Sequence, residues 1–282
     1  MAIQQHFVSY SGVDPALLRN EFAGKSVLIT GGGYGIGAAI AKSFAAAGVS
    51  QIILVGRKIA KLEVTANELC SFKDLKVSFH GVDITSKSDV ENLFASLTTS
   101  PDFLINNAGY MATPANFIQA DLEDYWEAFT INVYGTALIT QSFLRHREAS
   151  TANTPAVIIT LNTIGAYSVR VPNLSSYGAS KAALARWSEL IAVDIPETTA
   201  RFISLHPGAV MTAMSIKSGL DGVFPATDSV LAGDFTAWAC SDEAKFLAGR
   251  FAWVNWDVTD LVAAKEEIIS KDLYRTSLAS LV

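Results

Sequence analysis

Compact apolar runs alternate along the chain with segments in which apolar residues recur every three or four positions. The runs are rich in Val, Ile and Leu, which predicts strands that are buried on both faces of a sheet. They lie at 25–30, 51–55, 76–80, 103–106, 156–160 and 201–205. The intervening helical segments lie at 35–48, 58–72, 88–97, 122–147 and 176–194. This alternation predicts an α/β fold with a doubly wound parallel sheet, because right-handed crossovers place helices on both faces.

We expect residues 25–282 to form a single domain, since no repeat, charge block or low-complexity linker divides them. Residues 1–24 are interpreted as a short N-terminal extension, in which Asp14 caps a helical turn that begins at Pro15. The segment 211–234 is loosely periodic and contains three glycines and one proline, which favours a mobile lid. A last strand and a following helix are expected around 249–257.

Composition and charge narrow the classes of function. With 282 residues, of which 50% are hydrophobic and 17% charged, the chain can bury a full core and is not disordered. A net charge of −6 disfavours nucleic-acid and membrane partners. The sequence shows no secretory signal and no membrane span, and its two cysteines form no disulfide framework, so we expect a cytoplasmic protein. Four scattered histidines lack ligand spacing, so no metal site is expected.

A glycine-rich turn, T-G-G-G-Y-G-I-G at 30–37, joins the first predicted strand to a helix. Backbone N–H groups in such a turn can approach a pyrophosphate, which favours a dinucleotide site over a plain turn. The second strand ends at Gly56, where NAD sites usually carry a carboxylate, and Arg57 and Lys58 follow. Two cations there favour the 2′-phosphate of NADP(H), although they could instead form a solvated helix entry.

Tyr177 and Lys181 lie one helical turn apart at the start of the predicted helix 176–194. A neighbouring ammonium group lowers the pKa of a phenol, which starts near ~10. Tyr177 would then be a general acid in carbonyl reduction and a base in the reverse direction. By itself the pair could also be two ordinary helix-surface residues.

Further motifs follow in a fixed order: N-N-A-G at 106–109, N-V-Y-G at 132–135 and P-G at 207–208. With the glycine turn and the Tyr177–Lys181 pair, the region 25–212 resembles the short-chain dehydrogenase/reductase family, in its single-domain reductase branch. The C-terminal region 249–257 is similar to reductases of filamentous fungi, some of which serve secondary metabolism. The resemblance implies a Rossmann-type fold, a nicotinamide cofactor, which the two cations at 57 and 58 favour as NADP(H), a small-molecule carbonyl or alcohol substrate, and a homodimer or homotetramer.

The resemblance also implies a role for each matching position. The catalytic residues would be Asn132, Thr163, Tyr177 and Lys181. Asn132 would also interrupt the long helix 122–147 locally and hold a water that relays protons to Lys181. Asp83 would hold the adenine amino group, although its carboxylate could instead cap a turn. The cofactor would contact Gly31, Tyr34, Gly35, Ile36, Gly37, Arg57, Lys58, Asp83, Ile84, Asn107, Ala108, Gly109, Tyr177, Lys181, Pro207, Gly208, Val210 and Thr212.

The position where the family carries a substrate-binding serine departs from the pattern. Thr163 lies 14 residues before Tyr177 and aligns with it, while Asn162 is a competing alignment. The Thr163 hydroxyl can still donate to a substrate oxygen, whereas an amide could donate but could not share a proton with Tyr177. Ser168 would lie too close to Tyr177 in sequence.

The residues around the expected pocket are largely apolar. Thr163, Tyr110, Tyr167 and Met214 are expected to contact substrate, and Leu220 and Phe224 give the lid an apolar inner surface. This favours a bulky, mainly apolar substrate. The expected function is NADPH-dependent reduction of a ketone or aldehyde, or oxidation of the alcohol. The alternatives are an NADP-binding regulator or scaffold with little turnover and a non-redox cyclase or isomerase.

Overall fold

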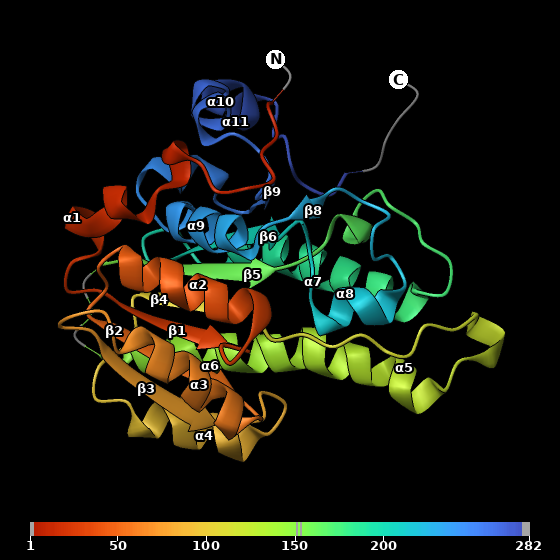
Figure 1. The fold of residues 1–282 in the computed structure, drawn as a ribbon, viewed down its shortest axis with the longest axis horizontal. Helices are drawn as coiled ribbons and strands as arrows, with labels where there is room; N and C mark the ends of the chain where they lie inside the picture. The colour runs from red at the N-terminus through yellow and green to blue at the C-terminus, as the bar shows by residue number, and fades with distance from the viewer. Residues whose placement is uncertain (1–2, 151, 153, 278–282) are drawn as a thin grey trace.

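The computed structural model describes residues 3–150, 152 and 154–277. Its centre is a seven-stranded parallel sheet of order β3-β2-β1-β4-β5-β6-β9 (Figure 1). The strands are β1 (Ser26–Thr30), β2 (Gln51–Gly56), β3 (Lys76–Gly81), β4 (Phe103–Asn106), β5 (Ala156–Leu161), β6 (Ala200–His206) and β9 (Arg250–Trp253). A short parallel pair, β7 (Ala209–Val210) and β8 (Ala226–Thr227), follows β6. The predicted doubly wound sheet is confirmed.

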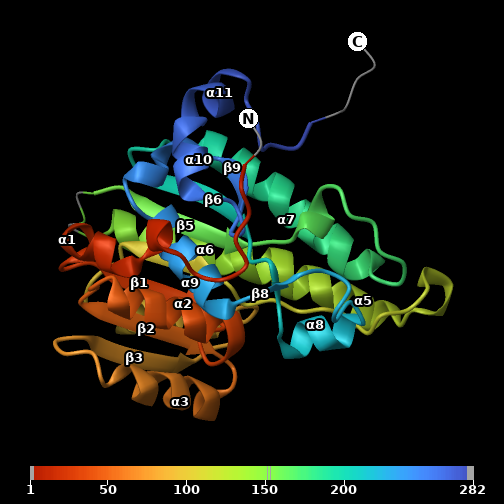
Figure 2. The ribbon, with the colours of Figure 1, turned by 45° about the horizontal axis from the view of Figure 1, so that its top comes forward.

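Helices cover both faces of the sheet (Figures 1 and 2). One layer contains α2 (Gly35–Ala46), α3 (Ile59–Leu69) and α9 (Ser229–Ala239). The other contains α4 (Lys87–Ser96), α5 (Leu122–Phe129), α6 (Thr136–Glu148) and α7 (Ser175–Asp194). Each layer covers its own buried cluster, because alternate side chains of a strand point to opposite faces. In β1, Val27 and Ile29 belong to one cluster and Leu28 to the other.

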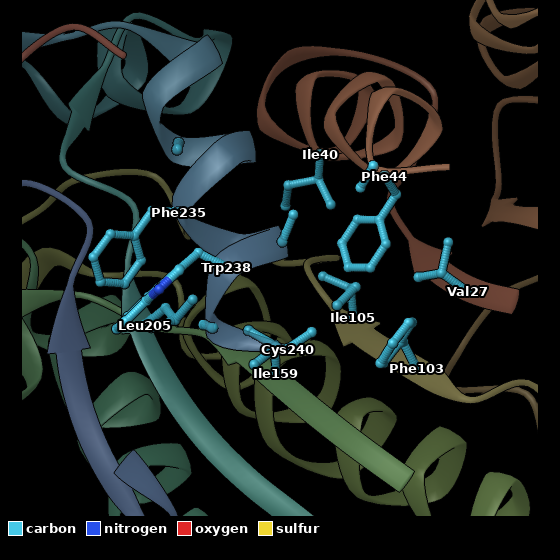
Figure 3. Close-up of a cluster of buried hydrophobic side chains, with 14 of the residues drawn as sticks. Val27, Ile40, Phe44, Phe103, Ile105, Ile159, Leu205, Phe235, Trp238 and Cys240 are labelled. Carbon is cyan, nitrogen blue, oxygen red and sulfur yellow. The ribbon is translucent and has the colours of Figure 1, made fainter. Parts of the chain in front are cut away.

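The contact between α2 and α9 corrects the predicted extent of the lid. Phe44 and Ile40 of α2 lie beside Phe235 and Trp238 of α9 above the sheet (Figure 3). A Cβ at Gly233 would lie 2.4 Å from Ser43 Oγ, so only glycine permits this approach. The prediction that the lid extends to 234 is wrong, because residues from Ser229 onward form a buried core helix.

The N-terminal residues are part of the domain rather than an extension. They form η1 (Ser11–Val13), η2 (Pro15–Leu18) and α1 (Arg19–Phe22). Val13, Leu18 and Phe22 are buried, and the Phe22 ring lies 4.8 Å from that of Phe103, centroid to centroid. Asp14 caps η2 as expected, accepting a hydrogen bond from the backbone N–H of Ala16 at 2.9 Å.

The remaining elements are short. They are η3 (Phe117–Gln119), η4 (Thr130–Gly135), η5 (Ile164–Ala166), α8 (Ala213–Ser218), η6 (Glu243–Leu247), α10 (Val258–Ala263) and α11 (Lys265–Ser270). The last strand and helix lie where the sequence predicts them. Among the helices of the described ranges, none has the length and apolar character needed to cross a bilayer.

Candidate active site

A cavity of about 1110 Å³ opens where β5 and β6 end. Its walls are mainly apolar side chains and backbone from several parts of the chain. These parts are the segment after β5, the start of α7, the stretch from β6 to β8, the end of β9 with the chain that follows it, the N-terminal segment, and the single residues Ile36 and Met111. Thr163 and Tyr177 both line it, as do Pro207, Gly208, Val210 and Thr212. The fold therefore brings two predicted catalytic residues, Thr163 and Tyr177, and the residues expected to contact nicotinamide to the same cavity.

Asn132 lies in a π-helical turn, η4, which separates α5 from α6. The predicted local interruption of one long helix is confirmed, and π-turns of this kind are frequent at functional sites. The Asn132 side chain is fully buried, and its Oδ1 accepts from the backbone N–H of Tyr110 at 2.7 Å. Its Nδ2 donates to Tyr110 O at 2.8 Å and to Ser180 Oγ at 3.0 Å. The amide thus fixes the 107–110 loop against α7.

Lys181 is buried, with 4% of its surface exposed, and its Nζ donates to Leu161 O at the end of β5 over 2.8 Å. A Cβ on Gly109 would lie 3.6 Å from Lys181 Nζ and 3.4 Å from Asn132 Oδ1. Gly109, Asn132 and Lys181 therefore lie close together, within ordinary contact distance.

The surroundings of Lys181 and Tyr177 shift the pKa of each side chain so that its neutral form is favoured. Burial lowers the pKa of Lys181 to about 8 and raises the pKa of Tyr177 to about 12. A lowered phenol pKa was expected from the neighbouring cation alone. In the structure the phenol pKa shifts in the opposite direction, because burial removes the water that would stabilise the phenolate.

The two candidates for the serine position have different surroundings. Asn162 is 3% exposed, and its amide accepts from Thr163 N at 2.9 Å and donates to Ser204 Oγ at 3.2 Å. The Thr163 hydroxyl accepts from Gly165 N at 3.2 Å, which caps η5. An accepting hydroxyl still has its proton to donate. The geometry therefore favours Thr163 over Asn162 as the group that contacts a substrate oxygen.

The glycine turn leads directly into α2, as predicted. Gly31 and Gly35 have φ values of 67° and 57°, which glycine adopts without strain. A Cβ at Gly37 would lie 2.2 Å from Gly31 O, so the turn closes only with glycine there. In the described structure Tyr34 provides no side-chain cap for α2, which leaves the first N–H groups of the helix, at Gly35 to Gly37, for an external anion.

Asn107 and Ala108 hold the ends of β1 and β4 together. Asn107 Nδ2 donates to Thr30 O at 2.9 Å and to Gly31 O at 3.2 Å. The backbone N–H groups of Asn107 and Ala108 donate to Thr30 Oγ1 at 3.1 and 3.0 Å. Thr30 was not predicted as a site residue, although its place at the end of β1 is the signal for it.

Charged groups gather where β2 and β3 end. Arg57 is exposed, and the Lys58 ammonium lies 5.8 Å from the centre of the Tyr34 ring. Asp83 Oδ1 accepts from Thr85 N and Thr85 Oγ1 at 2.9 and 2.7 Å. Burial opposes ionisation of Asp83, but these bonds and the charge of Arg57 outweigh it and lower the pKa of the carboxyl. The turn-capping alternative for Asp83 is therefore present in the structure. Ile84 packs against Gly135 of η4.

Of the expected substrate contacts, Tyr167 and Met214 line the cavity and Tyr110 does not. The Tyr110 hydroxyl donates to Asp124 Oδ1 on α5 at 2.5 Å, which turns the ring away, and Met111 takes its place in the wall. Lys217 of α8 lies over the Tyr110 ring at 5.0 Å from its centre and donates to Met111 O at 2.6 Å. Tyr110 thus supports the lid rather than the substrate.

Several lining residues were not predicted. Gln5 and Phe7 belong to no motif, and Trp253 and Asn255 lie in the region 249–257, to which the sequence assigned no contact with the site; only folding brings these four residues to the cavity. His206 also lines it. Burial lowers the pKa of His206 to about 4, so the ring is neutral at pH 7. Within the described ranges, no three His, Cys, Asp or Glu residues are grouped to hold a metal ion.

Comparison with known proteins gives the family. Residues 25–221 match the family model for short chain dehydrogenase. Short chain dehydrogenase pigC of Monascus ruber is 29% identical over 281 residues, covering 95% of this chain and 90% of that protein. Short chain dehydrogenase citE, from the same fungus, is 31% identical over 268 residues and covers 90% and 89%.

A solved structure agrees with this match. The 3-ketoacyl-(acyl-carrier-protein) reductase from Brucella melitensis, complexed with NADH, has 26% sequence identity and a TM-score of 0.71. The match covers 83% of this chain and 97% of that one. The fungal relatives align beyond the core motifs into the C-terminal region, as its sequence suggested. The chain belongs to the short-chain dehydrogenase/reductase family of oxidoreductases, which bind nicotinamide cofactors.

Proposed function

We propose that this protein is an NADP(H)-dependent reductase of a ketone or aldehyde on a bulky, mainly apolar substrate. The observation that carries the proposal is one cavity that extends from Ile36 at the start of α2 to Thr163 and Tyr177. A nicotinamide cofactor whose diphosphate is bound at the glycine turn and a carbonyl compound bound at Thr163 would then lie together in that cavity. The same site run in reverse would oxidise the alcohol.

The residues present fit a nicotinamide dinucleotide. The N–H groups of Gly35, Ile36 and Gly37 in the first turn of α2, which the Tyr34 side chain does not cap, suit a diphosphate, and Pro207 to Thr212 line the adjacent cavity. A bound nicotinamide would supply or accept the hydride. Gly56 leaves no carboxylate at the end of β2 to repel a 2′-phosphate, and Arg57 and Lys58 could bind one.

Each catalytic side chain has one task. Thr163 Oγ donates to the substrate oxygen, and the Tyr177 hydroxyl delivers the proton to that oxygen. Lys181 stabilises the phenolate that this leaves, because its ammonium group is fixed on the same helix face by Leu161 O. Asn132 acts through others, because its amide holds the 107–110 loop beside Lys181.

The substrate class follows from the cavity wall. The wall is mostly apolar at Met111, Tyr167, Met214, Leu220 and Phe224, and the volume of about 1110 Å³ would hold the nicotinamide end of the cofactor together with a bulky substrate. We therefore favour a polycyclic or aromatic carbonyl compound. The expected homodimer or homotetramer remains part of this proposal.

Replacement of Tyr177 tests the proposal. Tyr177→Phe should lower kcat by about 10²- to 10⁴-fold, because the proton donor is lost, while NADPH still binds. The measurement is NADPH consumption with a panel of bulky ketones, alongside an NADPH titration by fluorescence. Tyr134→Phe is the matched control, since Tyr134 is 51% exposed and does not line the cavity. Turnover by Tyr177→Phe at the wild-type rate would exclude the assigned acid.

A further inference from the structure

The N-terminal segment 4–10 is fixed to the chain that follows β9. Gln5 forms an antiparallel bridge with Trp256. His6 N donates to Asn255 O at 2.7 Å, and Asn255 Nδ2 donates back to His6 O at 2.7 Å. His6 Nε2 also lies 2.8 Å from Asp257 Oδ2, and its ring stacks on Tyr10 at 3.8 Å between centroids. These contacts on both sides of the backbone fix the segment in one position.

The same segment is attached to the base of the lid. The backbone N–H of Asp228 donates to Phe7 O at 2.8 Å. Asp228 follows β8 and is the N-cap of α9, so it marks the point where the lid ends and the core begins. Phe7 thus lies between the end of the lid and the chain after β9.

Extended backbone determines which side chains face inward. Successive side chains in an extended segment point to opposite sides, so Gln5 and Phe7 share one side. Both line the cavity that also contains Thr163 and Tyr177. Val8, next along the chain, is 64% exposed. The two inward side chains lie outside residues 25–221, which carry the family match.

We propose that Gln5 and Phe7 are substrate-contacting residues, and that Phe7 binds the apolar part of a bulky substrate remote from its carbonyl. The inference rests on the proposed function for the position of the reacting end. Phe7 supplies apolar area to the cavity that Phe224 and Trp253 also line, and Gln5 supplies a neutral hydrogen-bonding group to the same cavity. The N-terminal segment therefore contributes to substrate size selection.

Two ketones of different size test this. With NADPH saturating, Phe7→Ala should raise the KM for the bicyclic ketone 1-tetralone about five- to tenfold, because buried apolar contact is lost. The KM for cyclohexanone, which has no second ring to contact Phe7, should change less than twofold. Phe7→Leu, which keeps an apolar side chain, should restore most of the affinity for 1-tetralone. Val8→Ala is the matched control and should leave both values unchanged.

Equal KM changes for the two ketones, or the same effect from Val8→Ala, would overturn the inference. A binding measurement separates its failure from failure of the proposed function. In hydrogen exchange with NADPH and the tricyclic ketone 9-fluorenone, the amides of His6 and Asp228 should gain protection, even if no ketone is turned over. Protection confined to 163–171 would show that the ketone binds at the proposed site without contacting the N-terminal segment, so this inference would fail while the proposed function stands.

Discussion

Two walls of the cavity are built in different ways. The wall with Thr163, Tyr177 and Lys181 stands on central parallel strands and on α7, which is 20 residues long. The wall with Phe7, Met214 and Trp253 combines an N-terminal segment, a six-residue helix and the end of the edge strand β9. The first wall is held by many buried neighbours and the second by a few hydrogen bonds. We propose that the chemistry that needs fixed atoms lies on the first, rigid wall, and that substrate selection lies on the second, variable wall.

Among the changes considered, loss of the Lys181 ammonium group, on the rigid wall, should lower activity the most. Lys181→Met should lower kcat for reduction about 100-fold or more, because no charge then stabilises the Tyr177 phenolate. In the wild type, kcat/KM should fall as pH rises through about 8, where Lys181 loses its proton. A pH profile of NADPH oxidation checks both. A flat profile from pH 7 to 9.5 would contradict the role assigned to Lys181.

The same group links stability to pH, which offers a measurement without substrate. The pKa of Lys181 is about 8 in the folded protein, below its ordinary value of 10.5, so the unfolded chain binds more protons between these values. The free energy of unfolding of wild type, relative to Lys181→Met, should therefore rise with pH in this window, by at most about 1.4 kcal/mol per pH unit. Guanidinium titrations at pH 7.5 and 9.5 measure the difference, and subtraction of the variant removes the contribution of other groups.

Arg57 belongs to neither wall of the cavity, and its replacement tests whether the protein prefers NADP(H) to NAD(H). Arg57→Ala should raise the Kd of NADPH about 10- to 100-fold, since a charge-assisted hydrogen bond to the 2′-phosphate is lost. The Kd of NADH should not change. Arg145→Ala, an exposed arginine near the end of α6, is the control. Equal weakening of both cofactors, or of neither, would remove the argument for NADP(H).

The smallest effect is expected on the variable wall. Lys217→Met removes the hydrogen bond to Met111 O that fixes α8 to the 110 loop. The KM for a bulky ketone should rise about two- to fivefold with kcat nearly unchanged, because one hydrogen bond contributes about 1 kcal/mol. Lys245→Met, at an exposed ion pair with Asp242, is the control. A large loss of kcat would place the lid helix in the catalytic machinery and weaken the contrast between the walls.

The sequence by itself determined the sheet, most helices and the positions of Asn132, Thr163, Tyr177 and Lys181. These depend on local pattern and on motifs, and strand ends and helix turns carry their side chains to one edge with little freedom. The interruption of the long helix at Asn132 was predictable for the same reason.

Only the tertiary structure decided the burial around Tyr177 and Lys181, which reverses the shift in the phenol pKa expected from the pair alone. It also decided the place of Phe7, the end of the lid before Ser229, and the turning of Tyr110 toward Asp124. The physical reason is that desolvation and contacts between distant segments depend on every neighbour in space, and no local pattern of residues encodes those neighbours.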